Sequence, residues 1–184
     1  KPEVVELQRL TVPATYSYAA TPKLATSAYL MGYITEWDQY NLLPGESNIY
    51  FSNTFTGKGY INTAELTDTL PVSLGADNNI TLKREKRKEF TSQKLIGANR
   101  VETMSFLISV RNNKSQAAAI KLRDQIPLSQ NSDITVEAVE LTGGNLHRVT
   151  GEIVWDLKVE PRQTKEIILT YSVKHPKDKK VILE

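Results

Sequence analysis

The stretch ETMSFLISVRN, residues 102–112, decides the fold class because its hydrophobic side chains recur at every second position. Met104, Phe106, Ile108 and Val110 lie on one face of the chain if it is extended. A helical interpretation of the same residues would need a period near 3.6, and the strict alternation and β-branched content favour a strand instead. The stretch therefore predicts a β-strand with one buried face.

The sequence that follows continues this alternation of apolar and polar residues. Alternating segments follow at residues 117–128 (AAAIKLRDQIPL), 133–141 (DITVEAVEL), 151–161 (GEIVWDLKVEP) and 165–173 (KEIILTYSV). Turn-forming residues separate them, in RNNKS, PLSQNSD, TGGN and EPRQ. Short strands at this spacing predict an all-β sandwich, so we interpret residues 79–184 as an immunoglobulin-like β-sandwich with Trp155 in its core.

Residues 1–78 are predicted to form a smaller N-terminal β-module. Within it, SNIYFSNTF and GYINTA flank TGKG, residues 56–59, which predicts a hairpin turning at that loop. No linker rich in Ser, Gly or Pro separates the two halves. One continuous β-domain over residues 1–184 therefore stays open as an alternative.

Composition narrows the function classes. The chain has 184 residues with 23 basic and 21 acidic side chains, and its net charge of +2 is smaller than nucleic-acid binding along the chain usually requires. It has no cysteine, which excludes disulfides and thiolate metal sites. No apolar run approaches the roughly 20 residues of a membrane span. The chain does not begin with Met, so we expect a processed chain or a fragment of a longer protein.

A charged run, KREKRKE at residues 83–89, presents the first candidate surface. On a strand, one face would alternate in sign, and the other, with Lys86 and Lys88, would be wholly basic. A strand charged on both faces is expected at a sheet edge, where lysine prevents aggregation. The alternative is a binding site for an anionic partner such as a polysaccharide.

Seven aromatic residues between positions 29 and 55 form the second candidate. The first interpretation is that they build the core of the N-terminal module. For Trp37 and Tyr40, which lie in a predicted loop, the alternative is an exposed platform that stacks on sugar rings. Trp37, Tyr40, Lys86 and Lys88 are accordingly the predicted ligand-binding residues.

Catalytic, metal and cofactor motifs are not found in the sequence. Asp124 and Asp133 flank a turn and could act as the carboxylate pair of a glycoside hydrolase, but turn formation and pairing with a base explain them better. Neither His147 nor His175 has metal-ligand spacing, so both are expected at the surface. The Asp-Asn-Asn at residues 77–79 lacks the rest of a calcium loop.

Four motifs in order give a family resemblance: LLPG (residues 42–45), SLG (73–75), DQIPLS (124–129) and a closing W-x-L…Y-x-V (155–173). With the sequence around them, they resemble the C-terminal domain of the mucoidy inhibitor A family. The resemblance implies a place in a larger protein after a β-rich domain and a coiled coil, in the periplasm or cell envelope. It supplies no catalytic residues.

These observations together predict a non-enzymatic interaction or scaffold module. Its partner would be another protein, bound by β-augmentation at a strand edge, or an envelope polysaccharide. A carbohydrate-binding module is the alternative, and a glycoside hydrolase is a further one. Neither nucleic-acid binding nor a membrane span is expected, and the oligomeric state is not predicted.

Overall fold

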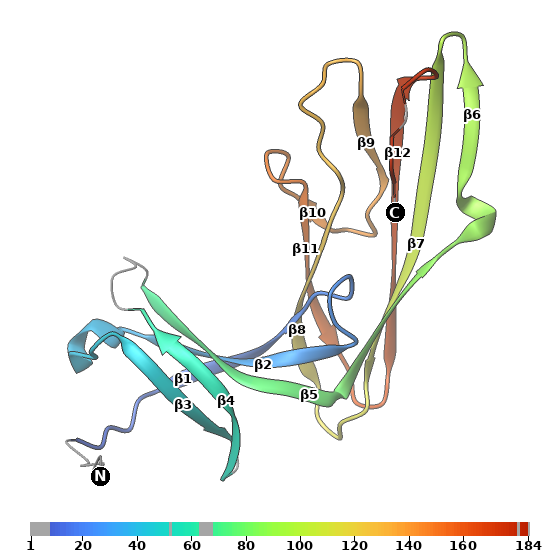
Figure 1. Cartoon of the computed structure of the whole chain (residues 1–184). Helices are drawn as coiled ribbons and strands as arrows, with labels where there is room; N and C mark the ends of the chain where they lie inside the picture. The colour runs from blue at the N-terminus through green and yellow to red at the C-terminus, as the bar shows by residue number, and fades with distance from the viewer. Residues whose placement is uncertain (1–7, 52, 63–67, 180, 184) are drawn as a thin grey trace. The chain divides into compact units, whose positions relative to one another are not determined.

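The computed structural model describes residues 8–51, 53–62, 68–179 and 181–183, and strands make up most of it (Figure 1). The prediction of an all-β fold is confirmed. Two short 3-10 helices, η1 (Trp37–Tyr40) and η2 (Lys88–Phe90), accompany the strands. The strands are β1 (Ala14–Ala20), β2 (Ser27–Thr35), β3 (Gly45–Phe51), β4 (Thr54–Ile61), β5 (Thr69–Lys86), β6 (Ser92–Ile96), β7 (Asn99–Asn112), β8 (Ala118–Gln125), β9 (Thr135–Glu140), β10 (Asn145–Leu146), β11 (Glu152–Val159) and β12 (Thr164–Pro176).

The chain forms two compact units. Unit 1 comprises residues 1–17 and 30–75, and unit 2 comprises residues 18–29 and 76–184. Strands β1, β2 and β5 each carry residues of both units. Compactness does not test whether either unit folds alone, so the predicted domain boundary between residues 78 and 79 stays a prediction.

Unit 2 holds the main hydrophobic core, to which β7, β8, β11 and β12 contribute most of the buried side chains. Strands of the large sheet follow the order β10-β11-β8-β1-β2-β5-β7-β12-β9, and β6 pairs with β7. The alternation seen in the sequence is the alternation of burial, since inward side chains of β7, β8, β11 and β12 are almost fully buried. They include Phe106, Ile108, Val110, Ile120, Leu122, Ile153, Trp155, Val159, Ile167, Leu169, Tyr171 and Val173.

The longest pairing in unit 2 joins β7 and β12. These strands are antiparallel from Thr164 opposite Arg111 to Pro176 opposite Asn99. On their inner face the rings of Phe106 and Tyr171 stack with 6.3 Å between centroids. Burying a large apolar side chain contributes about 1.5–3 kcal/mol, so this face supplies much of the stability of unit 2.

The hairpin of unit 1 is present, but its predicted turn is wrong. β3 pairs with β4 from Gly45 opposite Ile61 to Phe51 opposite Thr54, so the chain reverses between Phe51 and Thr54. Asn53 takes a left-handed conformation there (φ 62°), which Asn tolerates better than most residues. The TGKG segment therefore lies within β4, and a bulge at Ile49/Tyr50 shifts the register of the pairing there.

The charged run at residues 83–89 is not one strand. β5 ends at Lys86, Arg87 follows in an extended conformation, and η2 begins at Lys88. The Arg87 guanidinium lies 3.7 Å from the centroid of the Phe90 ring, which holds this corner together.

Candidate functional site

A buried ion pair lies in the interior of unit 2. Arg84 on β5 and Asp124 on β8 meet with 2.9 Å between Nε and Oδ2. The two side chains are only 12% and 0% exposed. The second carboxylate oxygen, Oδ1, accepts a hydrogen bond of 2.7 Å from the backbone N–H of Gln125. Each charge is therefore compensated within the protein, as burial of an ion requires.

Arg84 corrects the expectation that the charged run lies wholly at the surface. Its guanidinium also stacks on the Phe106 ring, 3.7 Å from the centroid. A charged side chain can be buried in the core of a β-sheet protein where it contacts an opposite charge and an aromatic ring. The spacing of residues in the sequence does not reveal that Asp124 and Phe106 are these partners of Arg84. The face of the charged run that alternates in sign does lie at the surface, since Lys83 and Glu85 on that face form an exposed ion pair of 2.8 Å.

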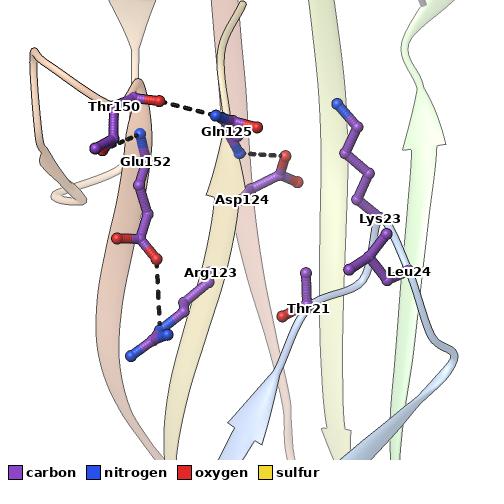
Figure 2. Close-up of a pocket in the computed structure, with 8 residues that line it drawn as sticks. All are labelled: Thr21, Lys23, Leu24, Arg123, Asp124, Gln125, Thr150 and Glu152. Atoms are coloured by element: carbon purple, nitrogen blue, oxygen red, sulfur yellow. Dashed lines mark hydrogen bonds and ion pairs between the residues drawn. The ribbon is translucent and has the colours of Figure 1, made fainter.

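A pocket of about 470 Å³ opens beside Asp124 (Figure 2). Its walls are the β1–β2 connection, with Lys23 and Leu24, and the adjacent ends of β8 and β11. In one wall, Nε of Arg123 lies 3.6 Å from Oε1 of Glu152. The side-chain amide of Gln125 donates a hydrogen bond of 2.8 Å to the Thr150 carbonyl. The remaining lining residues are Thr21 and Asp124.

The predicted carboxylate pair is not brought together in this pocket. Asp124 lines it, but both of its oxygens are occupied by Arg84 and the Gln125 backbone. Asp133 is not among the lining residues, and its carboxylate forms an ion pair of 2.7 Å with Lys179. In the turn it is the Asn131 side chain that accepts a hydrogen bond, from the Asp133 backbone N–H, so the local backbone bond predicted for the Asp133 side chain is made by Asn131 instead. Asp124 also pairs with a base, as expected.

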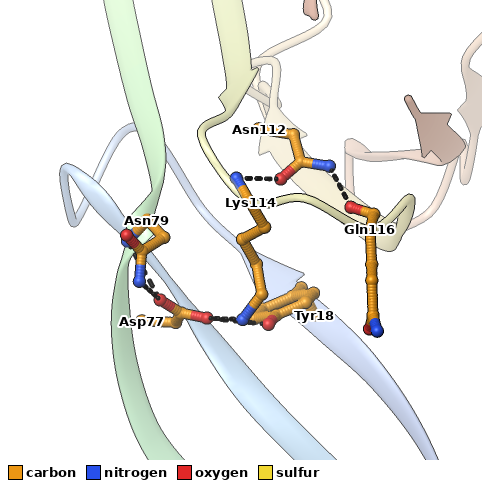
Figure 3. A network of polar contacts seen from close by, with 6 residues as sticks. All are labelled: Tyr18, Asp77, Asn79, Asn112, Lys114 and Gln116. Atoms are coloured by element: carbon orange, nitrogen blue, oxygen red, sulfur yellow. Dashed lines mark hydrogen bonds and ion pairs between the residues drawn. The ribbon is translucent and has the colours of Figure 1, made fainter. Parts of the chain in front are cut away.

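A second polar cluster of unit 2 centres on Asp77 (Figure 3). Its Oδ2 lies 2.6 Å from the Lys114 Nζ and accepts a hydrogen bond of 2.8 Å from the Tyr18 hydroxyl. Its Oδ1 accepts from the backbone N–H and the side-chain amide of Asn79, at 2.9 and 3.0 Å. The Asp77 carboxylate thereby joins three parts of unit 2: the strand β5, the β7–β8 turn and the end of β1.

These contacts set the charge state of the cluster. Burial alone would raise the pKa of Asp77, but the hydrogen bonds from Lys114, Asn79 and Tyr18 outweigh it and lower the pKa to about 2. The hydrogen bond to Asp77 raises the pKa of Lys114. Burial raises the pKa of Tyr18. All three groups therefore keep their usual charges at neutral pH, and the cluster acts as a structural clasp.

The clasp predicts an acid-dependent stability. Because the pKa of Asp77 is lower in the folded chain than in the unfolded chain, its contribution is complete above about pH 4 and is lost as the pH falls toward about 2. Chemical denaturation of wild type and Asp77→Asn, followed between about pH 5 and about pH 2, measures this. We expect the loss of stability on acidification to be smaller in the variant; equal losses would contradict the role given to Asp77.

The two histidines differ in their surroundings. His147 is exposed, as expected, and its Nδ1 lies 2.9 Å from the Thr150 hydroxyl. The expectation for His175 is wrong, because β12 continues through Pro176 and places this ring on the buried face with Val173. Its Nε2 lies 3.1 Å from Oε1 of Glu102 on β7.

The predicted ligand-binding residues lie in different units. Trp37 and Tyr40 are in η1 of unit 1, and both are half-buried. Lys86 and Lys88 are in unit 2, and both are exposed. Their role in binding stays a prediction.

An exposed aromatic face on the β3–β4 hairpin was not predicted. Tyr50, Phe55 and Tyr60 are 64%, 50% and 67% exposed. Tyr50 is paired with Phe55, and their rings meet edge-on at 5.5 Å. The expectation that the aromatic residues between positions 29 and 55 form the core of the first module is wrong for Tyr29, Tyr50, Phe51 and Phe55, which are all exposed. Among the described residues of unit 1, only Leu70 is a buried hydrophobic residue.

Two further classes of site find no support in the described part of the chain. No three His, Asp or Glu side chains there are grouped as a metal site would need. Its helices are also too short to cross a lipid bilayer.

Sequence comparison places the chain in a family. A family model described as "Domain of unknown function (DUF4139)" matches residues 4–177, and the chain belongs to this family. "Protein F37C4.5" of Caenorhabditis elegans is a relative with 22% identity over 197 aligned positions. The alignment covers 98% of this chain and 35% of the relative, so the chain spans about a third of that protein's length.

Proposed function

We propose that this member of the DUF4139 family is a non-enzymatic module that binds another protein. The observation that carries the proposal is the aromatic face of unit 1, formed by Tyr50, Phe55 and Tyr60 on one two-stranded sheet. Tyrosine and phenylalanine are enriched at the centres of protein interfaces, where they bury large rigid surfaces at low entropic cost. An exposed group of them marks an interaction surface.

The chemistry of unit 2 supports the same proposal. The acid that borders the pocket, Asp124, is held by Arg84, and Asp77 is held by Lys114. Both carboxylates therefore have structural partners that a general acid or nucleophile would have to give up. The pocket's other acid, Glu152, faces Arg123.

The proposal is tested by removing the three rings together. Tyr50→Ser with Phe55→Ser and Tyr60→Ser is expected to weaken binding of a protein partner by about tenfold or more, since interface aromatics dominate binding energy. Partners are identified by quantitative mass spectrometry after affinity purification from source cells with wild type and variant. The dissociation constant is then measured with the purified partner.

A matched variant controls for general loss of surface hydrophobicity. Leu24→Ser with Leu95→Ser and Val149→Ser removes three side chains of unit 2 that are at least as exposed. It should retain the partner. A partner that binds both triple variants equally, or that is lost from both, would refute a specific role for the aromatic face.

A carbohydrate is the second candidate for the same face. Glu46 is paired with Tyr60, and Asn48 with Lys58, so polar groups alternate with the rings along the hairpin. Sugars combine apolar faces that stack on rings with hydroxyls that need hydrogen bonds. Titration with soluble polysaccharides, with the same two triple variants, separates this candidate from a protein partner. Trp37 and Tyr40, which are half-buried, belong to the same unit and are the further aromatic residues to replace in that titration.

The wider setting is part of the proposal. The resemblance to the mucoidy inhibitor A family supports a scaffold role in a larger protein of the cell envelope, and we propose that the second module is immunoglobulin-like. Fractionation of source cells with an antibody to the chain tests the location.

A further inference from the structure

The core of unit 2 is left uncovered at one edge. β9 pairs antiparallel with β12, so Val136 stands opposite Val173 and Ala138 opposite Tyr171. Paired residues share a face of the sheet, and Val173 and Tyr171 are each only 1% exposed on the core side. Val136 is nevertheless half-buried and Ala138 is exposed. Among the residues that the structure describes, no opposing layer therefore covers the core face of β9.

The uncovered face forms one wall of a groove of about 410 Å³. The opposite wall includes Leu146 of β10, which is paired with the buried Ile153 and so also faces inward. Leu128, which is 54% exposed, borders the groove from the β8–β9 connection. The groove lies between two outer strands, β9 and β10, which end the strand order at its two extremes, and its walls combine apolar side chains with polar groups.

The backbone of β9 borders the same groove. β12 is its one partner among the described strands, and no backbone hydrogen bond joins residues 135–140 to a described residue across the other edge. Its N–H and C=O groups on that edge are thus available to an added strand. An extended peptide could use these backbone groups and the apolar side chains of the groove at once, whereas a lipid chain or a small ligand would use the groove alone.

Charge restricts what the peptide can be. Arg148 and Glu137 both border the groove, and the side chain of neither forms an ion pair or hydrogen bond with another residue that the structure describes. Arg148 would receive a carboxylate from the incoming strand. A second copy of β9 is disfavoured, because it would bring its own Glu137 and Glu140 against the same two acids.

We propose that the free edge of β9 binds an extended segment of a partner protein that alternates apolar side chains and carries an acidic residue. The segment adds as a strand beside β9, places an apolar side chain between Ala138 and Leu146, and directs its carboxylate to Arg148. This surface lies in unit 2 and is independent of the aromatic face of unit 1, so the two can be tested separately.

The probe is a phage-displayed library of random linear peptides, selected on the whole chain. Selected sequences are expected to alternate apolar residues and to contain Asp or Glu. A synthetic, fluorescently labelled peptide from the selection then gives dissociation constants by anisotropy. Arg148→Glu should weaken its binding about tenfold or more, since it replaces an attractive charge with a repulsive one. Ala138→Trp, which fills the groove from an exposed position, should abolish binding.

The matched control is Arg162→Glu. Arg162 is an exposed arginine of the β11–β12 turn, at the opposite end of β11 from the groove, and its replacement should leave peptide binding unchanged. The urea midpoint of each variant shows that it is folded.

Three results would overturn the proposal. Selection that enriches no peptide is one, and peptides that bind Arg148→Glu and Ala138→Trp as tightly as wild type are another. The third is a wild-type dimer in sedimentation velocity that Ala138→Trp converts to a monomer, because a second copy would then occupy the groove. None of these results changes the test of the aromatic face, which uses variants of unit 1.

Discussion

Replacing Asp124 with alanine is expected to destabilise the chain by about 3–5 kcal/mol, because Arg84 would stay in the interior without its carboxylate. The pair is almost fully buried, and the Phe106 ring, which carries no charge, cannot replace the carboxylate. Urea denaturation should show this as a midpoint lowered by about 1–3 M. A Trp37→Phe background lets the buried Trp155 alone report on unit 2.

The converse variant distinguishes a stranded charge from a lost contact. Arg84→Met together with Asp124→Leu removes both charges and keeps apolar volume, so it should recover most of the stability that Asp124→Ala loses. Asp156→Ala on the exposed face of β11 is the control, and it should change stability by less than about 0.5 kcal/mol. A double variant as unstable as Asp124→Ala would mean that the ion pair itself, and not the buried arginine charge left without Asp124, decides the stability.

Replacing Trp155 with alanine is expected to lower the free energy of unfolding by about 3–5 kcal/mol, because it opens a cavity in the centre of β11. The indole also fixes the β9–β10 connection, since its Nε1 donates a hydrogen bond of 2.6 Å to the Leu141 carbonyl. Gly144 lies against the same ring, where a Cβ atom would clash with Nε1. Trp155 therefore supports both the core and the loop that crosses it.

Trp155→Phe separates these two contributions. It keeps most of the apolar volume and loses the hydrogen bond, so we expect a smaller loss of about 1–3 kcal/mol. Thermal unfolding followed by circular dichroism compares both variants with Val149→Ala, whose side chain is exposed and should matter little. Equal melting temperatures for Trp155→Phe and wild type would show that the Leu141 contact contributes nothing.

Much of the fold was predictable because it depends on local order. Alternation in residues 102–112 and 165–173 correctly assigned β7, β12 and their buried faces, and it placed Trp155 in the core. The hairpin turn of unit 1 was misplaced, since glycines at Gly57 and Gly59 suggest a turn wherever they occur. The bulge at Ile49/Tyr50, which sets the register, has no clear sequence signature.

Little of the candidate site was predictable. The sequence predicts Arg84 at the surface with the rest of the charged run. Only the tertiary structure shows that Asp124 on β8 forms a buried ion pair with Arg84 on β5. Asp77 and Lys114 are 37 residues apart, and no pattern in either segment connects them. The uncovered face of β9 has a similar cause, because Val136 and Ala138 alternate like residues of any half-buried strand.

The sequence by itself determined the all-β class, the main strands and the inward side of each of them, because side chains alternate across a strand and apolar ones avoid water. Only the tertiary structure decided which charges pair inside, which aromatic residues stay exposed and which edge stays open. Those features depend on which strands become neighbours. That choice is made by contacts between residues far apart in the chain, which a local pattern does not record.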